Sequence, residues 1–123
     1  MKCLVWNMDY WKRSEDNRSR AWDYIQTVNA DICLLNECST HPSQEYSVHS
    51  IYRQGWGTGV FSKHKLTEIT NVTRGTTIIP LIKSHPESLV CSKLDLDGKN
   101  IIAIDLGSTT TDIILCLLYT SDA

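Results

Sequence analysis

Four polar residues at the ends of two apolar segments carry the kind of side chains that bind a hard divalent cation. Asn7 and Asp9 follow the first apolar run, and Asn36 and Glu37 follow the second. Two carboxylates and an amide form an oxygen-rich donor set, which suits Mg²⁺ because this ion takes few protein ligands and keeps waters or substrate phosphate. The alternative is that Asn7 is only a turn residue and that the acids are solvated strand ends.

A strand–helix–strand unit would bring these residues together. Residues 2–7 are predicted to form a central strand covered on both sides, because both of its faces are apolar. A helix is predicted over 14–29, capped by Ser14 and ended by Asn29, and a second strand over 31–37. Parallel pairing of the two strands would place their carboxyl ends at the edge where open α/β sheets bind ligands. The apolar stripe of the helix is Ala21, Trp22, Ile25 and Val28.

Short apolar segments bounded by turn residues predict further strands. Gly55-Trp56-Gly57 separates two of them, and Pro80 marks an edge or a bend in a third. Asp97-Gly98-Lys99 lies between two more, and an Asp-Gly turn between strand-like runs predicts a hairpin. The predicted segments are 48–53, 58–63, 78–82, 88–96 and 100–106.

The first segments resemble the opening of a known family. Residues 2–9 form an apolar strand that ends in Trp-Asn, and 30–37 form an Asp-Ile-hydrophobic strand that ends in an acid. With a helix between them, they resemble the start of the endonuclease/exonuclease/phosphatase superfamily, although Asn36 replaces the usual Gln. Residues 57–63 resemble the Gly-rich strand of that family, which leads to Ser-Lys or Ser-Arg. The similarity covers roughly residues 1–106.

The resemblance implies an α+β fold, the incomplete N-terminal part of a four-layer α/β/β/α sandwich, and a metal-dependent phosphoesterase. Asn7 and Glu37 are then the expected catalytic residues, and Glu37, Asp9 and Asn7 the expected ligands of Mg²⁺ or Mn²⁺. Glu37 would be the principal ligand, Asn7 would orient the phosphate or a water, and Asp9 would match a second acid of some nuclease members. The metal would polarise the phosphoryl oxygens while a water attacks phosphorus in line.

Two motifs that the resemblance requires do not occur in the 123 residues. One is the Asp-x-Asn pair that positions the nucleophile, and the other is the closing Asp-His pair. Residues 116–123 resemble, residue for residue, the translation of a transposase mosaic-end sequencing adapter. We therefore expect 1–115 to be a truncated domain, 116–123 to be an artefactual tail, and the chain as written to be inactive.

Aromatic and basic residues in two loops are candidates for substrate contacts. Trp11, Lys12 and Arg13 follow the expected metal loop and could face a phosphate, or form a solvated loop with one anchoring aromatic. Trp56 could stack on a base, or simply pack in its loop. The glycines around it lack the Gly-Lys-Ser/Thr ending of a phosphate-binding loop, so a tight turn into a strand is predicted.

Charge and composition narrow the class of protein. The formal net charge of −2 argues against a chain that grips nucleic acid by bulk positive charge, but a bound cation can supply local positive charge. Nucleic acid therefore stays a possible phosphoester partner. The longest apolar runs are too short to span a bilayer, so no membrane span is predicted. A cytoplasmic location is predicted from cysteines that form no disulfide pattern.

Cysteine and histidine usage gives no sign of a soft metal site. The five cysteines form no Cys-x-x-Cys and predict buried, reduced thiols, with a disulfide or a zinc site as the alternatives. The histidines are scattered and are predicted to lie on the surface or in loops; they are His41, His49, His64 and His85.

Three functions compete at this point. The first is phosphoester hydrolysis by the parent enzyme, on nucleic acid, phosphoinositide, sphingolipid or a small phosphomonoester. The second is a non-catalytic α/β binding module, although the loop after residues 2–6 has no Gly-x-Gly for a dinucleotide. The third is a truncated reading frame without function.

Overall fold

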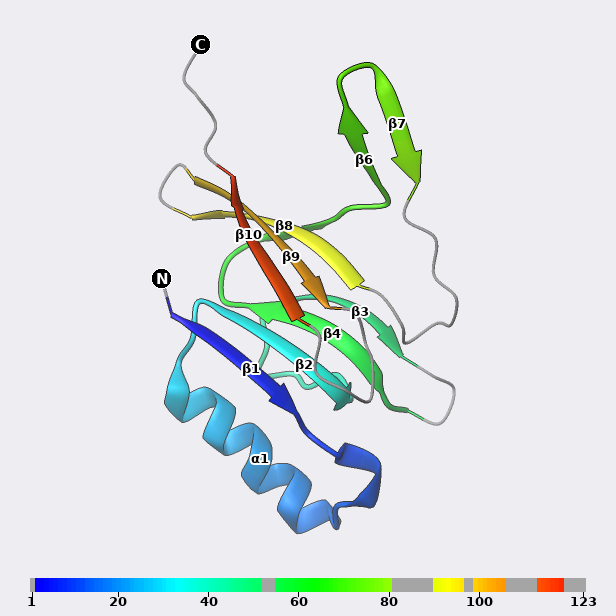
Figure 1. Ribbon diagram of the computed structural model, residues 1–123. Helices are drawn as coiled ribbons and strands as arrows, with labels where there is room; N and C mark the ends of the chain where they lie inside the picture. The colour runs from blue at the N-terminus through cyan, green and yellow to red at the C-terminus, as the bar shows by residue number, and fades with distance from the viewer. Residues whose placement is uncertain (1, 52–54, 81–89, 97–98, 106–112, 119–123) are drawn as a thin grey trace.

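The computed structural model describes residues 2–51, 55–80, 90–96, 99–105 and 113–118 of the chain. Two four-stranded sheets lie against each other, and helix α1 (Glu15–Val28) covers the outer face of the first sheet (Figure 1). This arrangement confirms the predicted α+β class with a mixed sheet and a packed helix. Within the described ranges it has three layers, and the fourth, helical layer of the expected sandwich is not seen.

The first sheet has the strand order β1-β2-β4-β3, with β1 and β2 parallel and the other pairs antiparallel. The second sheet is antiparallel and has the order β10-β9-β8-β5, while β6 and β7 form a separate hairpin that projects from it (Figure 1). The strands of the first sheet are β1 (Cys3–Asn7), β2 (Ile32–Cys38), β3 (Tyr46–Ile51) and β4 (Gly57–Ser62). The others are β5 (Leu66–Glu68), β6 (Asn71–Arg74), β7 (Thr77–Pro80), β8 (Val90–Leu96), β9 (Lys99–Asp105) and β10 (Ile113–Leu118).

The helix begins and ends at the two residues that the sequence predicts. The Ser14 hydroxyl accepts a hydrogen bond from the Asn17 backbone N–H at 3.3 Å, which satisfies one of the free donors of the first turn. Asn29 ends the helix in the left-handed conformation, with φ at 51°. The stripe facing the sheet is buried at Ala21, Trp22 and Ile25, and half-buried at Val28.

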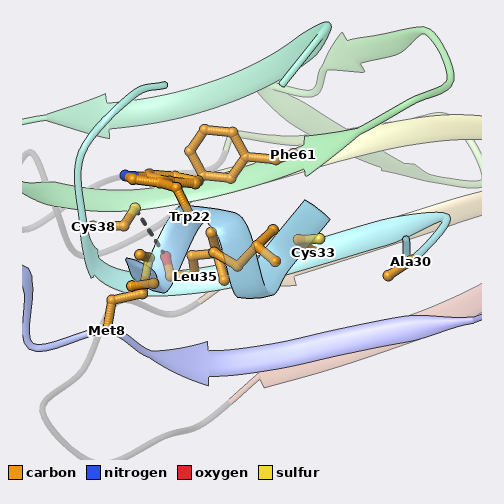
Figure 2. Close-up of a cluster of buried hydrophobic side chains, with 9 residues drawn as sticks. Met8, Trp22, Ala30, Cys33, Leu35, Cys38 and Phe61 are labelled. Atoms are coloured by element: carbon orange, nitrogen blue, oxygen red, sulfur yellow. Dashed lines mark hydrogen bonds between the residues drawn. The ribbon is translucent and has the colours of Figure 1, made fainter. Parts of the chain in front are cut away.

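The main described core lies between α1 and the first sheet (Figure 2). Trp22 and Phe61 meet edge to face, with ring centroids 5.9 Å apart and planes at 74°. Leu35 of β2 and Met8, just after β1, also belong to this cluster and are fully buried. Burial of these large side chains fixes which face of each strand points to the helix.

The predicted central position of the first strand is wrong. Strand β1 lies at the edge of its sheet in the described part of the chain, and β2 is buried along both faces instead. Leu4 and Trp6 pack under α1, but Val5 on the opposite face is 48% exposed. Apolar residues on both faces of β1 therefore do not indicate burial here.

The other predicted strands are found with small changes of bounds. The Gly55-Trp56-Gly57 segment leads into β4, which pairs with β3, and Pro80 ends β7. Strands β8 and β9 pair so that Leu96 lies opposite Lys99, which confirms the hairpin, while residues 97–98 lie outside the described residues. Strands β5, β6 and β10 were not predicted from the sequence.

Residues 116–118 of the expected tail continue β10, where Cys116 pairs with Ile102 of β9. The remaining tail, 119–123, lies outside the described residues. In the part of the chain that the structure describes, no helix has the length and apolar character needed to cross a membrane.

Candidate functional site

The carboxyl ends of β1 and β2 lie side by side, as the sequence predicts. Asn7 and Asn36 are register partners in the parallel pair. The preceding partners, Trp6 and Leu35, both pack against the helix-side core, so strand alternation directs Asn7 and Asn36 to the opposite face. Asn36 is buried there and Asn7 is half-buried.

A bulge in β2 brings Glu37 to the same face. Leu35 pairs with Gly59 and Cys38 pairs with Gly57, so Asn36 and Glu37 together oppose a single residue of β4. Leu35 and Cys38 both belong to the core under α1, which shifts the alternation by one residue (Figure 2). The Cys38 thiol donates to the Leu35 carbonyl at 3.5 Å across the bulge (Figure 2). The two intervening side chains therefore share the face away from the helix.

Two of the three predicted ligands have a left-handed backbone. Asp9 has φ at 48° and Glu37 has φ at 47°. Among the described residues only one other non-glycine residue has a positive φ, and that residue is the helix-ending Asn29. Left-handed backbone costs an ordinary residue roughly 1–2 kcal/mol, and such strain clusters at functional sites. Both acids are half-buried.

The amide of Asn7 is held in one orientation. Its Oδ1 accepts a hydrogen bond from the Asp9 backbone N–H at 3.1 Å, which identifies the oxygen side of the amide because a backbone N–H requires an acceptor. The Met8 N–H in turn donates to the Asn36 carbonyl at 2.9 Å and ties the loop to β2. The side-chain N–H groups of Asn7 are therefore not the atoms that bind the Asp9 backbone.

Two arginines brace the loop between β1 and α1. Arg13 Nε donates to the Met8 carbonyl at 2.5 Å, and its guanidinium lies 5.4 Å from the Trp6 ring centroid. Arg18, on α1, donates from Nε to the Tyr10 carbonyl at 2.8 Å. We did not predict a role for Arg18 from the sequence, because its partners are backbone carbonyls rather than a recognisable motif.

The three predicted ligands lie at the ends of two neighbouring strands and in the loop that follows the first. Asn7, Asp9 and Glu37 supply one amide and two carboxylate groups near a common edge of the sheet, and hard cations prefer such oxygens. Within the described residues no cluster of three or more His, Cys, Asp or Glu side chains could hold a metal. A site here would therefore depend on the amide, on water and on substrate oxygens for its remaining positions.

A second charged cluster lies at the opposite end of β2. The Asp31 carboxylate accepts a hydrogen bond from the Lys2 backbone N–H at 2.7 Å and one from His64 Nε2 at 3.2 Å, and Lys63 Nζ lies 3.7 Å away. The Lys2 hydrogen bond, His64 and Lys63 together lower the pKa of Asp31, against the opposing effect of burial. This cluster holds together the amino-terminal ends of β1 and β2 and the segment after β4.

The described histidines and cysteines agree largely with the sequence. His41 lies in the loop after β2 and stacks on Trp22 at 4.9 Å, and His49 is exposed on β3. Cys33 and Cys38 are buried free thiols as predicted, whereas Cys3 is free but exposed. His85 lies outside the described residues, as do the side chains of Cys91 and Cys116.

Comparison of the chain with protein-family models, with curated proteins and with solved structures gives no match.

Proposed function

We propose that the carboxyl ends of β1 and β2 form the metal-binding half of a divalent-metal-dependent phosphoesterase of the endonuclease/exonuclease/phosphatase type. The observation that supports this most directly is the register of Asn7 with Asn36, followed by the bulge that places Glu37 on the same face. Glu37 is the principal ligand of Mg²⁺ or Mn²⁺, and Asp9 is a second acid in its neighbourhood. On this proposal the three layers are the first part of a four-layer sandwich in a cytoplasmic enzyme.

Asn7 acts mainly on the substrate. Its Oδ1 already accepts the Asp9 N–H, so its N–H groups are the atoms best placed to donate to a phosphate oxygen. A second lone pair of Oδ1 remains for the cation. The bound metal would supply Lewis-acid polarisation of the phosphoryl group and stabilise the leaving oxygen. Asp9 contributes both by its carboxylate and by fixing the Asn7 amide through its backbone.

We further propose that the 123-residue chain binds the cation without hydrolysing phosphoesters. The chain has no Asp-x-Asn or Asp-His sequence, and positioning of the nucleophile supplies a large part of catalysis in phosphoryl transfer. We expect no Mg²⁺-dependent cleavage of bis(p-nitrophenyl) phosphate. Robust cleavage that Glu37→Ala abolishes would show that the chain is active as it stands.

The test of the site itself is a measurement of Mn²⁺ binding. Electron paramagnetic resonance detects the free ion, and Mg²⁺ is added as a competitor. Glu37→Gln is expected to weaken Mn²⁺ binding at least about tenfold, because it removes the charged ligand and keeps the side-chain volume. The matched control is Glu45→Gln. Glu45 is an exposed acid just before Tyr46, at the amino-terminal end of β3. Equal Mn²⁺ affinity of the wild type and Glu37→Gln would contradict the proposal.

A further inference from the structure

Two tryptophans that are far apart in the sequence stack at the edge that holds the candidate site. Trp11 lies in the short 3₁₀ turn Tyr10–Lys12, and Trp56 lies just before β4; their ring centroids are 6.3 Å apart and their planes are inclined by 30°. Trp11 is 47% exposed and Trp56 is half-buried. Because Gly57 pairs with Cys38, Trp56 enters β4 beside the bulge that carries Glu37. Figure 1 shows the turn after β1 and the start of β4 at the same end of the molecule.

The turn that carries Trp11 is held by hydrogen bonds from two arginine side chains to its backbone. Arg18 donates to the carbonyls of Tyr10 at 2.8 Å and Trp11 at 3.3 Å, and Arg13 donates to the Met8 carbonyl. These bonds use the two guanidinium groups to fix the backbone on both sides of the exposed ring. A ligand that stacks on Trp11 would therefore order little of the protein, which favours binding.

A cation accompanies the exposed ring. Lys12 Nζ lies 4.6 Å from the centroid of the Trp11 ring, and its side chain is exposed. Flexible Lys12 can move to a phosphate when another ring takes its place on Trp11. An aromatic face with an adjacent ammonium group is the combination that binds a base together with its phosphate.

We propose that Trp11, Trp56 and Lys12 form a stacking platform for an unpaired base of single-stranded nucleic acid, with Lys12 contacting the backbone phosphate. As a statement about substrate class it rests on the proposed function of the same edge. Stacking is tolerant of sequence because every base has a π-face, and it adds affinity that the net charge of −2 does not provide. A membrane surface also attracts Trp and Lys, but insertion into lipid does not require two rings to stack.

The test uses the complete 123-residue chain in EDTA, so that binding is measured without metal. A labelled oligothymidylate of about ten nucleotides is compared by fluorescence anisotropy with an abasic strand of the same length. The thymidylate is expected to bind more tightly and to quench tryptophan fluorescence. Trp11→Ala is expected to weaken thymidylate binding at least about fivefold while leaving abasic binding unchanged. Lys12→Gln should reduce the slope of log affinity against log salt concentration by about one, which corresponds to the loss of one phosphate contact.

The matched control is Tyr24→Ala, because Tyr24 is a comparably exposed aromatic residue (54%) on α1. It should leave binding unchanged, and circular dichroism checks that each variant is folded. Equal binding of the thymidylate and the abasic strand, or an unaffected Trp11→Ala, would overturn the platform. So would tighter binding to anionic phosphatidylserine vesicles that the thymidylate does not displace. Mn²⁺ binding is measured separately, so either proposal can fail alone.

Discussion

Leu35 and Cys38 lie on the same face of β2 although they are three positions apart along the chain. An unbroken strand would place them on opposite faces, because side chains alternate. The bulge between them resolves this by directing Asn36 and Glu37 away from the helix. Glu37 therefore reaches the predicted site through a local irregularity, at the cost of a left-handed backbone.

This backbone makes a direct prediction for Glu37. Glu37→Gly should be more stable than Glu37→Ala by about 1 kcal/mol, because glycine accepts a φ of 47° without the steric cost that a Cβ brings. Both variants should lose Mn²⁺ binding. The free energies of unfolding are measured in urea.

The control for this comparison is Thr67, an exposed residue within strand β5. There the order should reverse, with Thr67→Ala more stable than Thr67→Gly, since glycine weakens a regular strand. An alanine at position 37 as stable as the glycine would mean that the left-handed conformation is not adopted in solution.

The bulge also shows where prediction from the sequence stops. The helix was predictable because Ser14 and Asn29 are its actual caps and the apolar stripe has helical spacing. The adjacency of the first two strand ends followed from a right-handed strand–helix–strand unit. Nothing in the sequence indicated the left-handed backbone in the bulge, because glycine is the usual residue at such a position and Glu37 stands there instead.

Contacts between residues far apart in the sequence were the other feature that could not be predicted. The apolar faces of β1 predicted coverage on both sides, but Val5 is exposed because coverage depends on which strand lies next to it. The contact between Trp11 and Trp56 joins two loops whose spacing in the sequence carries no periodic signal. The metal role of Asn7, Asp9 and Glu37 stays a prediction.

The Asp31 cluster predicts how stability depends on acidity. The hydrogen bond from the Lys2 backbone N–H, aided by His64 and Lys63, lowers the pKa of Asp31 in the folded chain below its ordinary value of 3.8. A carboxylate with a lowered folded-state pKa stabilises the fold above its unfolded pKa, and this contribution is lost as the pH falls through the folded-state pKa. The free energy of unfolding should therefore decrease as the pH is lowered from about 4.

Urea titrations between pH 2.5 and 6 check this contribution. Asp31→Asn should be less stable than the wild type near pH 6, and the difference should shrink toward the acid end of the range. Asp23→Asn, on the exposed side of α1, should not show this converging difference. A difference between Asp31→Asn and the wild type that is constant with pH would assign the effect to packing rather than to charge.

The buried thiols predict an order of chemical reactivity. Burial, with a further contribution from Cys3, raises the pKa of Cys33 to about 12, so almost none of it is thiolate at pH 8. Cys33 is also only 3% exposed, and Cys38 is fully buried. Cys3 is exposed, although burial raises its pKa as well.

Iodoacetamide should therefore modify Cys3 first and slowly, and should leave Cys33 and Cys38 unmodified in the folded chain. Peptide mapping by mass spectrometry measures each site, and in urea all three should react at similar rates. Modification of Cys33 as fast as Cys3 under native conditions would show that the sheet beneath α1 opens readily, and that the bulge carrying Glu37 is not held by a stable core.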